Sequence, residues 1–409
     1  MSSRANRERI RRREADCNRR SKPAAEEQLA QFLSGIRDVS RADRRTGGKA
    51  GNMDRIRVAL FGLTHPHALG HLKTLQLSDM VEGILLFDDD PRVVADVQEK
   101  TGTKVHGGYD DLDKLLDGES FEVGVADFQN HVNGALCLRL IEEGVHVISE
   151  KPVSNSPDEL SRIVDAASRK GVKLGVMYQN RYHPVAREAR RLVDDGVIGR
   201  VTGCEARMIT SQVKFRNPGH WLFDRRKAGG GILSWLGCHY IDLLRYVLDD
   251  DVVEISAIAD TLSGEDIDVE DVASLAFRFG KGAIGSLHAG YQLAMSIPGY
   301  SGATYDTYVG FRGTEGRVYW NPVDRPPVLH AESAAVGWRA SPVRSFHYAL
   351  PELDCYGGAF GLAFLERFFH SVNGDGEPPA TGEDALRAAR IIEAAYASSE
   401  TGRRVEITS

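Results

Sequence analysis

The 409-residue sequence is poor in cysteine and has no long apolar run. Its five cysteines lie far apart and form no CxxC pair; they are Cys17, Cys137, Cys204, Cys238 and Cys355. This spacing argues against a disulfide framework and a zinc knuckle, and it favours free thiols in a reducing, cytoplasmic compartment. No apolar run reaches the roughly 18–20 residues that a membrane-spanning helix needs, so we expect no contact with a membrane.

Charge is distributed unevenly along the chain. Residues 1–52 contain 14 Lys and Arg against 7 Asp and Glu, a net charge of +7, whereas the whole chain carries −7. The remaining residues therefore carry −14, and an acidic body is a poor general binder of nucleic acid. The basic arm is either a tail that touches RNA, DNA or an anionic surface, or a disordered extension. We favour the extension, because the compact pattern begins directly after Met53.

The length of the chain predicts two domains, and the pattern of residues 53–179 defines the first. Apolar runs alternate with helical patterns from Ile56 onward, and Ser156, Pro157 and Glu159 form the start signal of one helix. Such alternation predicts a parallel sheet covered by helices on both faces. The expected strands are 56–62, 81–88, 121–128, 145–149 and 172–179, and the expected helices are 66–77, 91–101, 133–143 and 156–171.

The pattern changes after His183, and residues 180–409 form the predicted second domain. A helix is expected at 184–195. Two glycine-bounded turns, 280–282 and 313–316, join neighbouring runs as hairpins, which indicates a largely antiparallel sheet. The expected strands are 201–209, 253–259, 272–279, 283–289, 307–312 and 317–320, and the later helices are 241–247, 359–372 and 384–398. The predicted fold class is α/β: a Rossmann-type parallel sheet followed by an α+β domain with a large sheet.

The first strand–helix turn is the expected dinucleotide site. In a Rossmann fold its glycines let the backbone approach the pyrophosphate. Here Gly62 matches the first glycine, while Thr64 and His67 occupy the second and third positions, with His65 between them. The fingerprint is weak by itself. His67 and His71 share a helix face at metal-binding spacing, but no nearby cysteine or carboxylate completes a ligand set, so we expect no metal.

Asp88 ends the second strand, 26 residues after Gly62. A carboxylate at this place accepts hydrogen bonds from both ribose hydroxyls and repels a 2′-phosphate, which favours NAD over NADP. The alternative interpretation of Asp88 is an ordinary strand-end turn residue.

Two further motifs give the sequence a resemblance to a known family. Glu150-Lys151-Pro152 follows an apolar strand, and residues 229–242 read GGGILSWLGCHYID. With Asn130-His131 and the terminal SSETGRRV segment, these motifs resemble the glucose–fructose oxidoreductase / inositol dehydrogenase / rhizopine-catabolism (Gfo/Idh/MocA) family over residues 54–409. The resemblance implies NAD(P)-dependent oxidoreduction of a sugar, polyol or related secondary alcohol, and a homodimer or homotetramer.

The resemblance also implies roles for single residues. Lys151 matches the lysine beside the nicotinamide and the substrate hydroxyl, and His239 matches the histidine that takes the hydroxyl proton. Asn130, His131 and Glu150 match cofactor-contacting positions, and Arg181 and Trp221 are further candidates for the substrate pocket. The sequence departs from the family four residues before His239, where Trp235 stands in place of the usual aspartate.

Several alternatives stay open at this point. Asp224, His220 and Asp242 are the candidates to replace the missing aspartate, and Trp235 is either a core aromatic or a stacking surface for a sugar ring. Two other functions compete with a dehydrogenase. One is a lyase or glycosidase that retains NAD and oxidises its substrate transiently, and the other is a non-catalytic regulator that binds NAD or a sugar.

Overall fold

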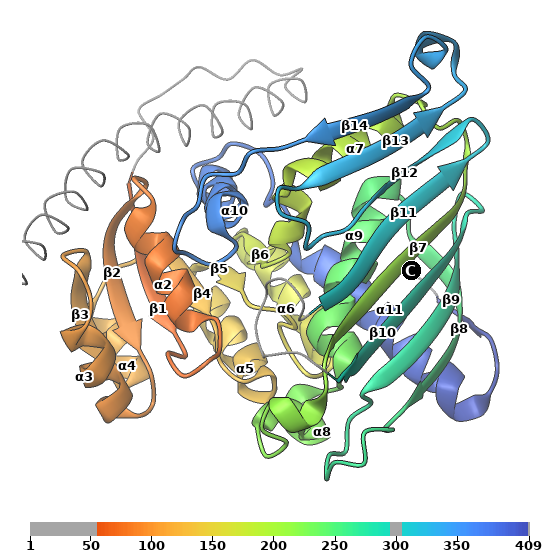
Figure 1. Ribbon diagram of the computed structural model, residues 1–409. Coiled ribbons are helices and arrows are strands. Elements are labelled where there is room, and N and C mark those ends of the chain that lie inside the picture. Colours follow the sequence, from red (N-terminus) through yellow and green to blue (C-terminus); the bar gives the residue numbers. More distant parts are fainter. Residues whose placement is uncertain (1–54, 295–304, 408–409) are drawn as a thin grey trace, which may run out of the picture.

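The computed structural model describes residues 55–294 and 305–407. The predicted N-terminal extension at 1–52 lies outside the described residues. Two sheets organise the chain, a six-stranded parallel sheet and a nine-stranded sheet (Figure 1). The predicted fold class is confirmed. None of the described helices is long and apolar enough to cross a membrane.

The parallel sheet has the strand order β3-β2-β1-β4-β5-β6. Its strands are β1 (Ile56–Phe61), β2 (Val81–Phe87), β3 (Val105–Tyr109), β4 (Val123–Ala126), β5 (His146–Ser149) and β6 (Leu174–Val176). Its helices are α2 (Ala68–Leu77), α3 (Pro91–Glu99), α4 (Leu112–Gly118), α5 (Asn130–Glu142) and α6 (Pro157–Lys170). The order reverses between β1 and β4, and a doubly wound sheet binds its ligand at such a switch point.

Some predicted boundaries in this sheet were wrong, and β3 and α4 were not predicted. The start signal at α6 is confirmed, since the Ser156 side chain accepts from the Glu159 amide and Gly171 ends the helix with φ +67°. Helix α2 begins at Ala68 and not at Pro66. The reason is local, because Nδ1 of His65 accepts the amide of His67 and holds this segment as a turn.

The second sheet has the order β14-β13-β12-β11-β7-β10-β9-β8-β15 and is antiparallel except between β7 and β10. Its strands are β7 (Val201–Ser211), β8 (Val252–Asp260), β9 (Val272–Phe279), β10 (Ile284–Leu293), β11 (Tyr305–Gly313), β12 (Gly316–Trp320), β13 (Val328–Ser333), β14 (Val343–His347) and β15 (Val405–Glu406). The two predicted hairpins are confirmed as β9–β10 and β11–β12. Sequence analysis did not predict β13, β14 and β15.

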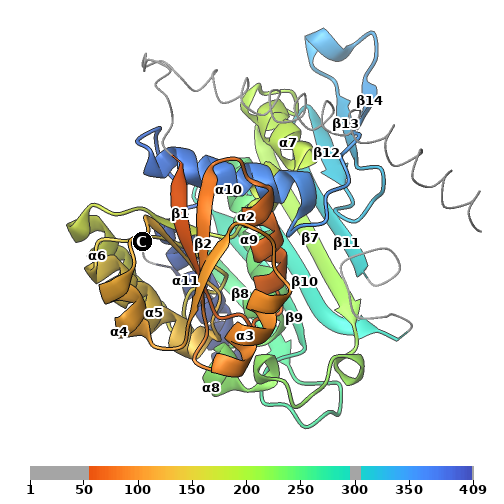
Figure 2. The ribbon, with the colours of Figure 1, turned by 90° about the vertical axis from the view of Figure 1, so that its left-hand side faces the viewer.

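Helices pack on one face of the large sheet. These are α7 (Pro184–Asp194), α9 (Cys238–Leu248) and α11 (Gly382–Thr401). Helix α10 (Gly358–Val372) packs on α2, and the short α8 (Arg225–Ala228) packs on α5. Helices α9 and α11 lie between the two sheets (Figures 1 and 2). Alternate side chains of β8 and β9 are exposed, which leaves the other face of the sheet to solvent.

Candidate active site

The carboxyl ends of four parallel strands meet at the switch point. Gly62 follows β1, Asp88 follows β2, Asp127 follows β4, and Glu150-Lys151 follow β5. Gly62 has φ +86°, and a Cβ atom there would lie 2.5 Å from the carbonyl oxygen of Asp127. Only glycine fits such a left-handed, tightly packed position without strain. The first position of the predicted dinucleotide turn therefore has the geometry that the turn requires.

The rest of the turn differs from a glycine-rich loop. The amide of His65 donates to the carbonyl of Gly62, and the amide of His67 donates to Nδ1 of His65 at 3.3 Å. Thr64 is exposed at the surface. Two amides that a pyrophosphate would use are thus occupied inside the turn, and the exposed Thr64 side chain lies beside them.

Asp88 is 1% exposed at the end of β2. Its Oδ1 accepts the amide of Asp90 at 3.2 Å, while Oδ2 has no partner in the part of the chain that the structure describes. Burial raises the pKa of this carboxyl group. A buried oxygen without a partner needs one from a ligand or water. Asp88 therefore fits a ribose hydroxyl.

Lys151 is 0% exposed, and the segment that contains Trp235 covers it. Its Nζ donates to the carbonyl oxygen of Trp235 at 3.0 Å and lies 3.8 Å from the centroid of the Trp235 ring. The π face of an indole attracts a cation at this distance. The residue that replaces the family's aspartate therefore contacts the ammonium group through both its carbonyl and its ring.

The carboxylate of Glu150 holds two of the predicted histidines. Its Oε1 lies 2.9 Å from Nδ1 of His67 and 2.7 Å from Nε2 of His71, and its Oε2 lies 3.9 Å from Nζ of Lys151. Burial would raise the pKa of Glu150, but these cationic and hydrogen-bonding neighbours hold it well below its usual value. Within residues 55–294 and 305–407, no group of three His, Cys, Asp or Glu side chains is arranged to hold a metal ion.

Asp127 belongs to the same cluster, and sequence analysis missed it. Burial raises its pKa to about 7, and neither carboxylate oxygen has a partner among the described residues. Its charge in turn raises the pKa of His71, against the effect of burial. The available signal was its position, because Asp127 directly follows a buried strand, as Asp88 does.

His239 lies in the first turn of α9, with its ring edge-on to Tyr178 at 5.7 Å. Its Nδ1 has no partner in the described ranges. Burial, and after it the charge of Lys151, lowers its pKa well below the usual value. A neutral imidazole at this place accepts or donates one hydrogen bond at each ring nitrogen.

None of the three candidates replaces the missing aspartate beside His239. Asp242 accepts from Nε of Arg181 at 2.9 Å, Asp224 accepts the amide of Arg226, and His220 accepts the amide of Leu222. Arg181 also contacts Asp384, so its guanidinium group is committed to two carboxylates. Arg181, a candidate for the substrate pocket, therefore lies in ion pairs with Asp242 and Asp384 and not beside Lys151.

Aromatic rings form one wall of the site. Trp235, in the π-helical turn Leu233–Gly237, stacks on His67 at 5.2 Å and meets Trp221 edge-on at 6.2 Å. Tyr356, just before α10, packs on His67 and His71 at 4.7 and 4.3 Å. The structure thus brings Trp221 and Trp235 together. Trp235 is both a buried aromatic and part of the site.

The remaining cofactor candidates lie in the first turn of α5. Nδ2 of Asn130 donates to the carbonyl oxygen of Ala228 at 2.8 Å and so ties α5 to α8. His131 is exposed.

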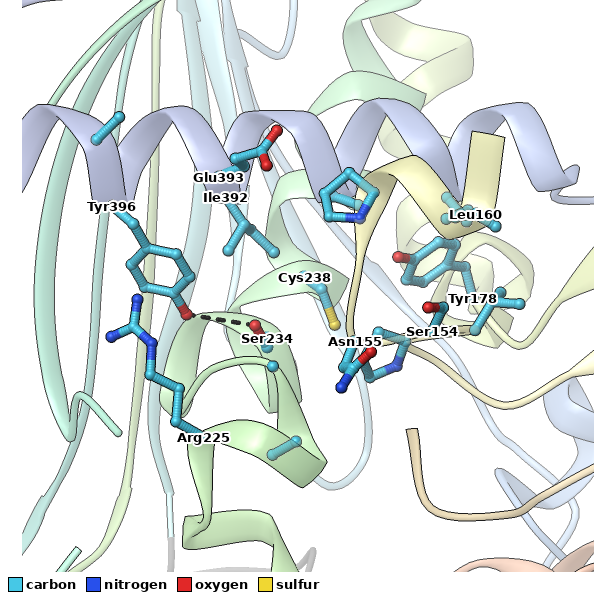
Figure 3. Close-up of a pocket in the computed structure, with 18 of the residues that line it drawn as sticks. Ser154, Asn155, Leu160, Tyr178, Arg225, Ser234, Cys238, Ile392, Glu393 and Tyr396 are labelled. Carbon is cyan, nitrogen blue, oxygen red and sulfur yellow. Dashed lines mark hydrogen bonds between the residues drawn. The ribbon is translucent and has the colours of Figure 1, made fainter. Parts of the chain in front are cut away.

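A surface pocket of about 330 Å³ lies between α6, α8 and α11 (Figure 3). Ser234 and Cys238 line it, and they flank the segment that contains Trp235. The hydroxyl groups of Ser234 and Tyr396 lie 3.3 Å apart across its wall. Tyr178, whose ring meets His239, and Ala228, whose carbonyl accepts from Asn130, also line it.

Comparison with known proteins identifies the two halves of the chain. Residues 56–178 match the profile of the oxidoreductase family with an NAD-binding Rossmann fold, and residues 186–319 match the GFO/IDH/MocA C-terminal domain. A 1,5-anhydro-D-fructose reductase of Ensifer adhaerens is 28% identical over 72% of this chain and 83% of its own. A myo-inositol 2-dehydrogenase of Thermotoga maritima is 26% identical over 86% of this chain and 98% of its own.

Solved structures show the same fold. A levoglucosan dehydrogenase in complex with NADH and levoglucosan superposes with a TM-score of 0.76, at 21% identity over 87% of this chain and all of that one. Other relatives carry NADP(+) in their names, such as a D-xylose 1-dehydrogenase of Haloarcula marismortui, 22% identical over 86% of this chain and 93% of its own. The chain therefore belongs to the Gfo/Idh/MocA family of NAD(P)-dependent oxidoreductases.

Proposed function

We propose that this enzyme interconverts a secondary alcohol and a ketone on a sugar or polyol, with NAD as its cofactor. The observation that carries the proposal is the fully buried Lys151 ammonium group at the carboxyl end of β5. A buried cation beside a switch point stabilises negative charge as it develops on a reacting oxygen. The relatives named above act on an anhydrosugar, an inositol and levoglucosan, which supports this class of substrate.

The preference for NAD over NADP rests on Asp88. Its unpaired Oδ2 is available to a ribose hydroxyl, and its negative charge repels a 2′-phosphate. In this proposal Gly62, Thr64 and His65 border the pyrophosphate. The other cofactor contacts would come from His67, Asn130, His131 and Glu150.

Lys151 and His239 are proposed to contact the reacting hydroxyl. The nicotinamide, when bound, accepts or supplies the hydride. An ammonium group has three protons, and Lys151 uses one for the Trp235 carbonyl, which leaves two for the substrate oxygen. The rings of Trp221 and Trp235 offer apolar faces to the carbon skeleton of a sugar. Arg181 is retained only as an indirect contributor, through its ion pair with Asp242.

The relatives are dehydrogenases and reductases, which gives no support to the lyase, glycosidase and regulator alternatives. The test has two parts. Calorimetry with NAD and NADP is expected to show tighter binding of NAD. Absorbance at 340 nm with 1,5-anhydro-D-fructose, myo-inositol, levoglucosan and D-xylose is expected to show turnover with at least one. If calorimetry detects no complex at a near-saturating concentration of either dinucleotide, the proposed function is wrong.

The division at residue 179, the cytoplasmic location and the assembly also stay proposals. The open face of the large sheet exposes Ile258 and Ile284, which are 76% and 57% accessible. Exposed apolar side chains on a regular sheet favour pairing with a second copy. We propose a homodimer or homotetramer through this face, and light scattering after gel filtration tests it. A single 45 kDa species would contradict the proposal.

A further inference from the structure

Glu270, just before β9, is a buried carboxylate that none of the roles described above uses. Its side chain accepts three hydrogen bonds. Oε2 accepts the amide of Gly231 at 2.8 Å, while Oε1 accepts the amide of Leu233 at 3.0 Å and the hydroxyl group of Tyr396 at 2.9 Å. Such bonds compensate a buried carboxylate for the water that it has lost. Glu270 therefore connects α11, which carries Tyr396, to the backbone that leads into α9.

The backbone of Glu270 strengthens the same connection. Its carbonyl oxygen accepts the amide of Ile232 at 3.0 Å. A Cβ atom at Gly231 would lie 1.9 Å from that carbonyl oxygen, and one at Gly230 would lie 2.0 Å from the hydroxyl oxygen of Tyr396. Only glycine permits so close an approach. The glycines before the π-helical turn thus let the chain reach Glu270 and Tyr396.

The segment that Glu270 holds, residues 231–237, is the one that covers Lys151. It contains the π-helical turn and Trp235. The amide of Trp235 donates to the carbonyl oxygen of Gly231 at 2.9 Å, and the carbonyl oxygen of Trp235 accepts from Nζ of Lys151 at 3.0 Å. A continuous series of contacts therefore runs from the carboxylate of Glu270, through the backbone of segment 231–237, to the ammonium group.

Glu270 also caps the helix that carries Trp235. Helical backbone continues without a break from Ile232 through the π-helical turn into α9. The first amides of a helix have no partner inside it, and Glu270 accepts those of residues 231–233. The helix dipole also favours a negative charge at this end. Loss of the carboxylate is therefore expected to loosen the start of the helix, where Trp235 lies, more than its later turns.

We propose that Glu270 is a positioning residue that sets the orientation of the Lys151 ammonium group through segment 231–237. This inference rests on the proposed oxidoreductase function. When the Trp235 carbonyl is fixed, one ammonium proton is fixed, and the other two have defined directions toward the substrate oxygen. A shift of the segment moves this carbonyl and the indole together. Misplacement of a reacting group by about 1 Å costs up to about 10²-fold in rate.

The structural link is tested without any ligand. In the full chain labelled with 5-fluorotryptophan, the fluorine signal that disappears in Trp235→Phe belongs to Trp235. Glu270→Gln keeps the size of the side chain but places an NH₂ donor against donors that the carboxylate accepted. The Trp235 signal is expected to shift or broaden, and the signal of Trp338 is expected to stay. An unchanged Trp235 signal would overturn the proposal.

Asp271→Asn is the matched control. Asp271 is the next residue in the chain, and its carboxylate is also buried and accepts two amides, those of Leu262 at 2.8 Å and Ser263 at 2.7 Å. The control thus makes the same chemical change in a neighbouring carboxylate that holds a different loop. Its Trp235 signal and its kcat are expected to match the wild type. Equal changes in both variants would show a general disturbance and would contradict a specific role of Glu270.

The role in turnover is tested with the substrate that the wild type turns over best. Glu270→Gln is expected to lower kcat by roughly 10–10²-fold, and Tyr396→Phe, which removes one of the three donors, by less. The dissociation constant of NAD should change little. In a Lys151→Ala background Glu270→Gln should change kcat by no more than about twofold, because the group that it positions is gone. The same loss in both backgrounds would show that Glu270 does not act through Lys151.

The outcomes separate this inference from the proposed function. If the wild type binds no dinucleotide, the proposed function is wrong, whereas the fluorine spectra decide by themselves whether Glu270 holds segment 231–237. Melting temperatures show whether a loss of kcat reflects unfolding. If Glu270→Gln melts early, Tyr396→Phe supplies a second variant that retains the carboxylate. Its Trp235 signal is expected to shift, and the absence of a shift would overturn the proposal.

Discussion

The two ends of the candidate site, along the carboxyl edge of the parallel sheet, differ in how they depart from a common pattern. At the end formed by β1 and β2, Gly62 has the left-handed backbone of a phosphate turn and Asp88 keeps an unpaired oxygen. At the end formed by β5 and α9, Trp235 replaces an aspartate and covers Lys151, and two imidazoles surround Glu150. Gly62 and Asp88 thus keep the expected pattern while Thr64 and His67 depart from it, and at the other end Lys151 and His239 are kept while Trp235 stands in place of the aspartate.

This difference shows which constraints are shared and which are local. A pyrophosphate is common to NAD and NADP, so the backbone turn proposed to border it meets the same chemical group with either dinucleotide. The side chains around the reacting carbon contact the substrate instead, and substrates differ from one relative to another. Function is therefore better read from the side chains around Lys151 than from the fold.

The largest effect is expected at the reacting end. Lys151→Ala removes the cation that stabilises the developing oxyanion, and kcat should fall by roughly 10²–10³-fold. The dissociation constant of NAD, measured by calorimetry, should change little, since the nucleotide is held at the other end. Lys170→Ala, on the exposed last turn of α6, is the matched control. If Lys151→Ala lowers the affinity for NAD as much as it lowers kcat, the two ends do not have the separate roles proposed for them.

The next effect is expected at the nucleotide end. Asp88→Ala removes a charged acceptor of the ribose hydroxyls, which is worth about 1.5–3 kcal/mol, or roughly 10–100-fold in affinity for NAD. The preference over NADP should narrow as well, because the repulsion of the 2′-phosphate disappears. Calorimetry with both dinucleotides measures the two changes, and Asp113→Asn on the exposed surface of α4 is the control. An unchanged affinity would mean that Asp88 is an ordinary turn residue.

A stability effect is expected at Asp127, between the two ends. Burial raises its pKa to about 7 in the folded state, so between about pH 4 and pH 7 the folded chain holds a proton that the unfolded chain has lost. Stability contributed by this group is present at low pH and is lost as the pH rises to 7. Asp127→Asn should therefore raise the free energy of unfolding relative to the wild type more at pH 8 than at pH 5, by on the order of 2 kcal/mol, which denaturant titrations at the two pH values measure. A constant difference would contradict the raised pKa.

The smallest effect is expected from Trp235→Phe. The smaller ring retains an apolar face but offers a weaker one to the Lys151 ammonium, a loss of about 0.5–1 kcal/mol, or a few-fold in kcat/KM. Trp338→Phe is the matched control, because Arg344 lies 3.8 Å from the Trp338 ring in the same kind of contact, outside the site. A loss comparable to that of Lys151→Ala would show that the indole takes part in chemistry directly.

The parts of the fold that sequence analysis predicted depend on local patterns. Strand β1, helix α6 with its Ser156 cap, and the β9–β10 hairpin each follow from hydrophobic period and turn residues within a few positions. Strand β3 was missed because its sequence, VHGGY, contains two glycines and has no clear alternation. Strand β6 was expected to reach Gln179, but a 3₁₀ turn begins there.

Sequence analysis could predict only those site residues that belong to short motifs. Lys151 and His239 were predicted from short motifs, but their surroundings come from distant segments. His71 and Glu150 are 79 positions apart, and Tyr356 reaches the same cluster from just before α10. No local pattern encodes such meetings, because they arise from how strands and helices pack. For the same reason the sequence did not show that Asp242 is committed to Arg181.

The environment of Lys151 has a consequence for its susceptibility to glycation. Reducing sugars condense with accessible amines and thereby glycate proteins over time. An ammonium group that is bonded to a carbonyl oxygen has no free lone pair with which to condense with the aldehyde of a sugar that enters the site. The amine on which turnover is proposed to depend is thus shielded from the side reaction that carbohydrate carbonyls would otherwise inflict on it.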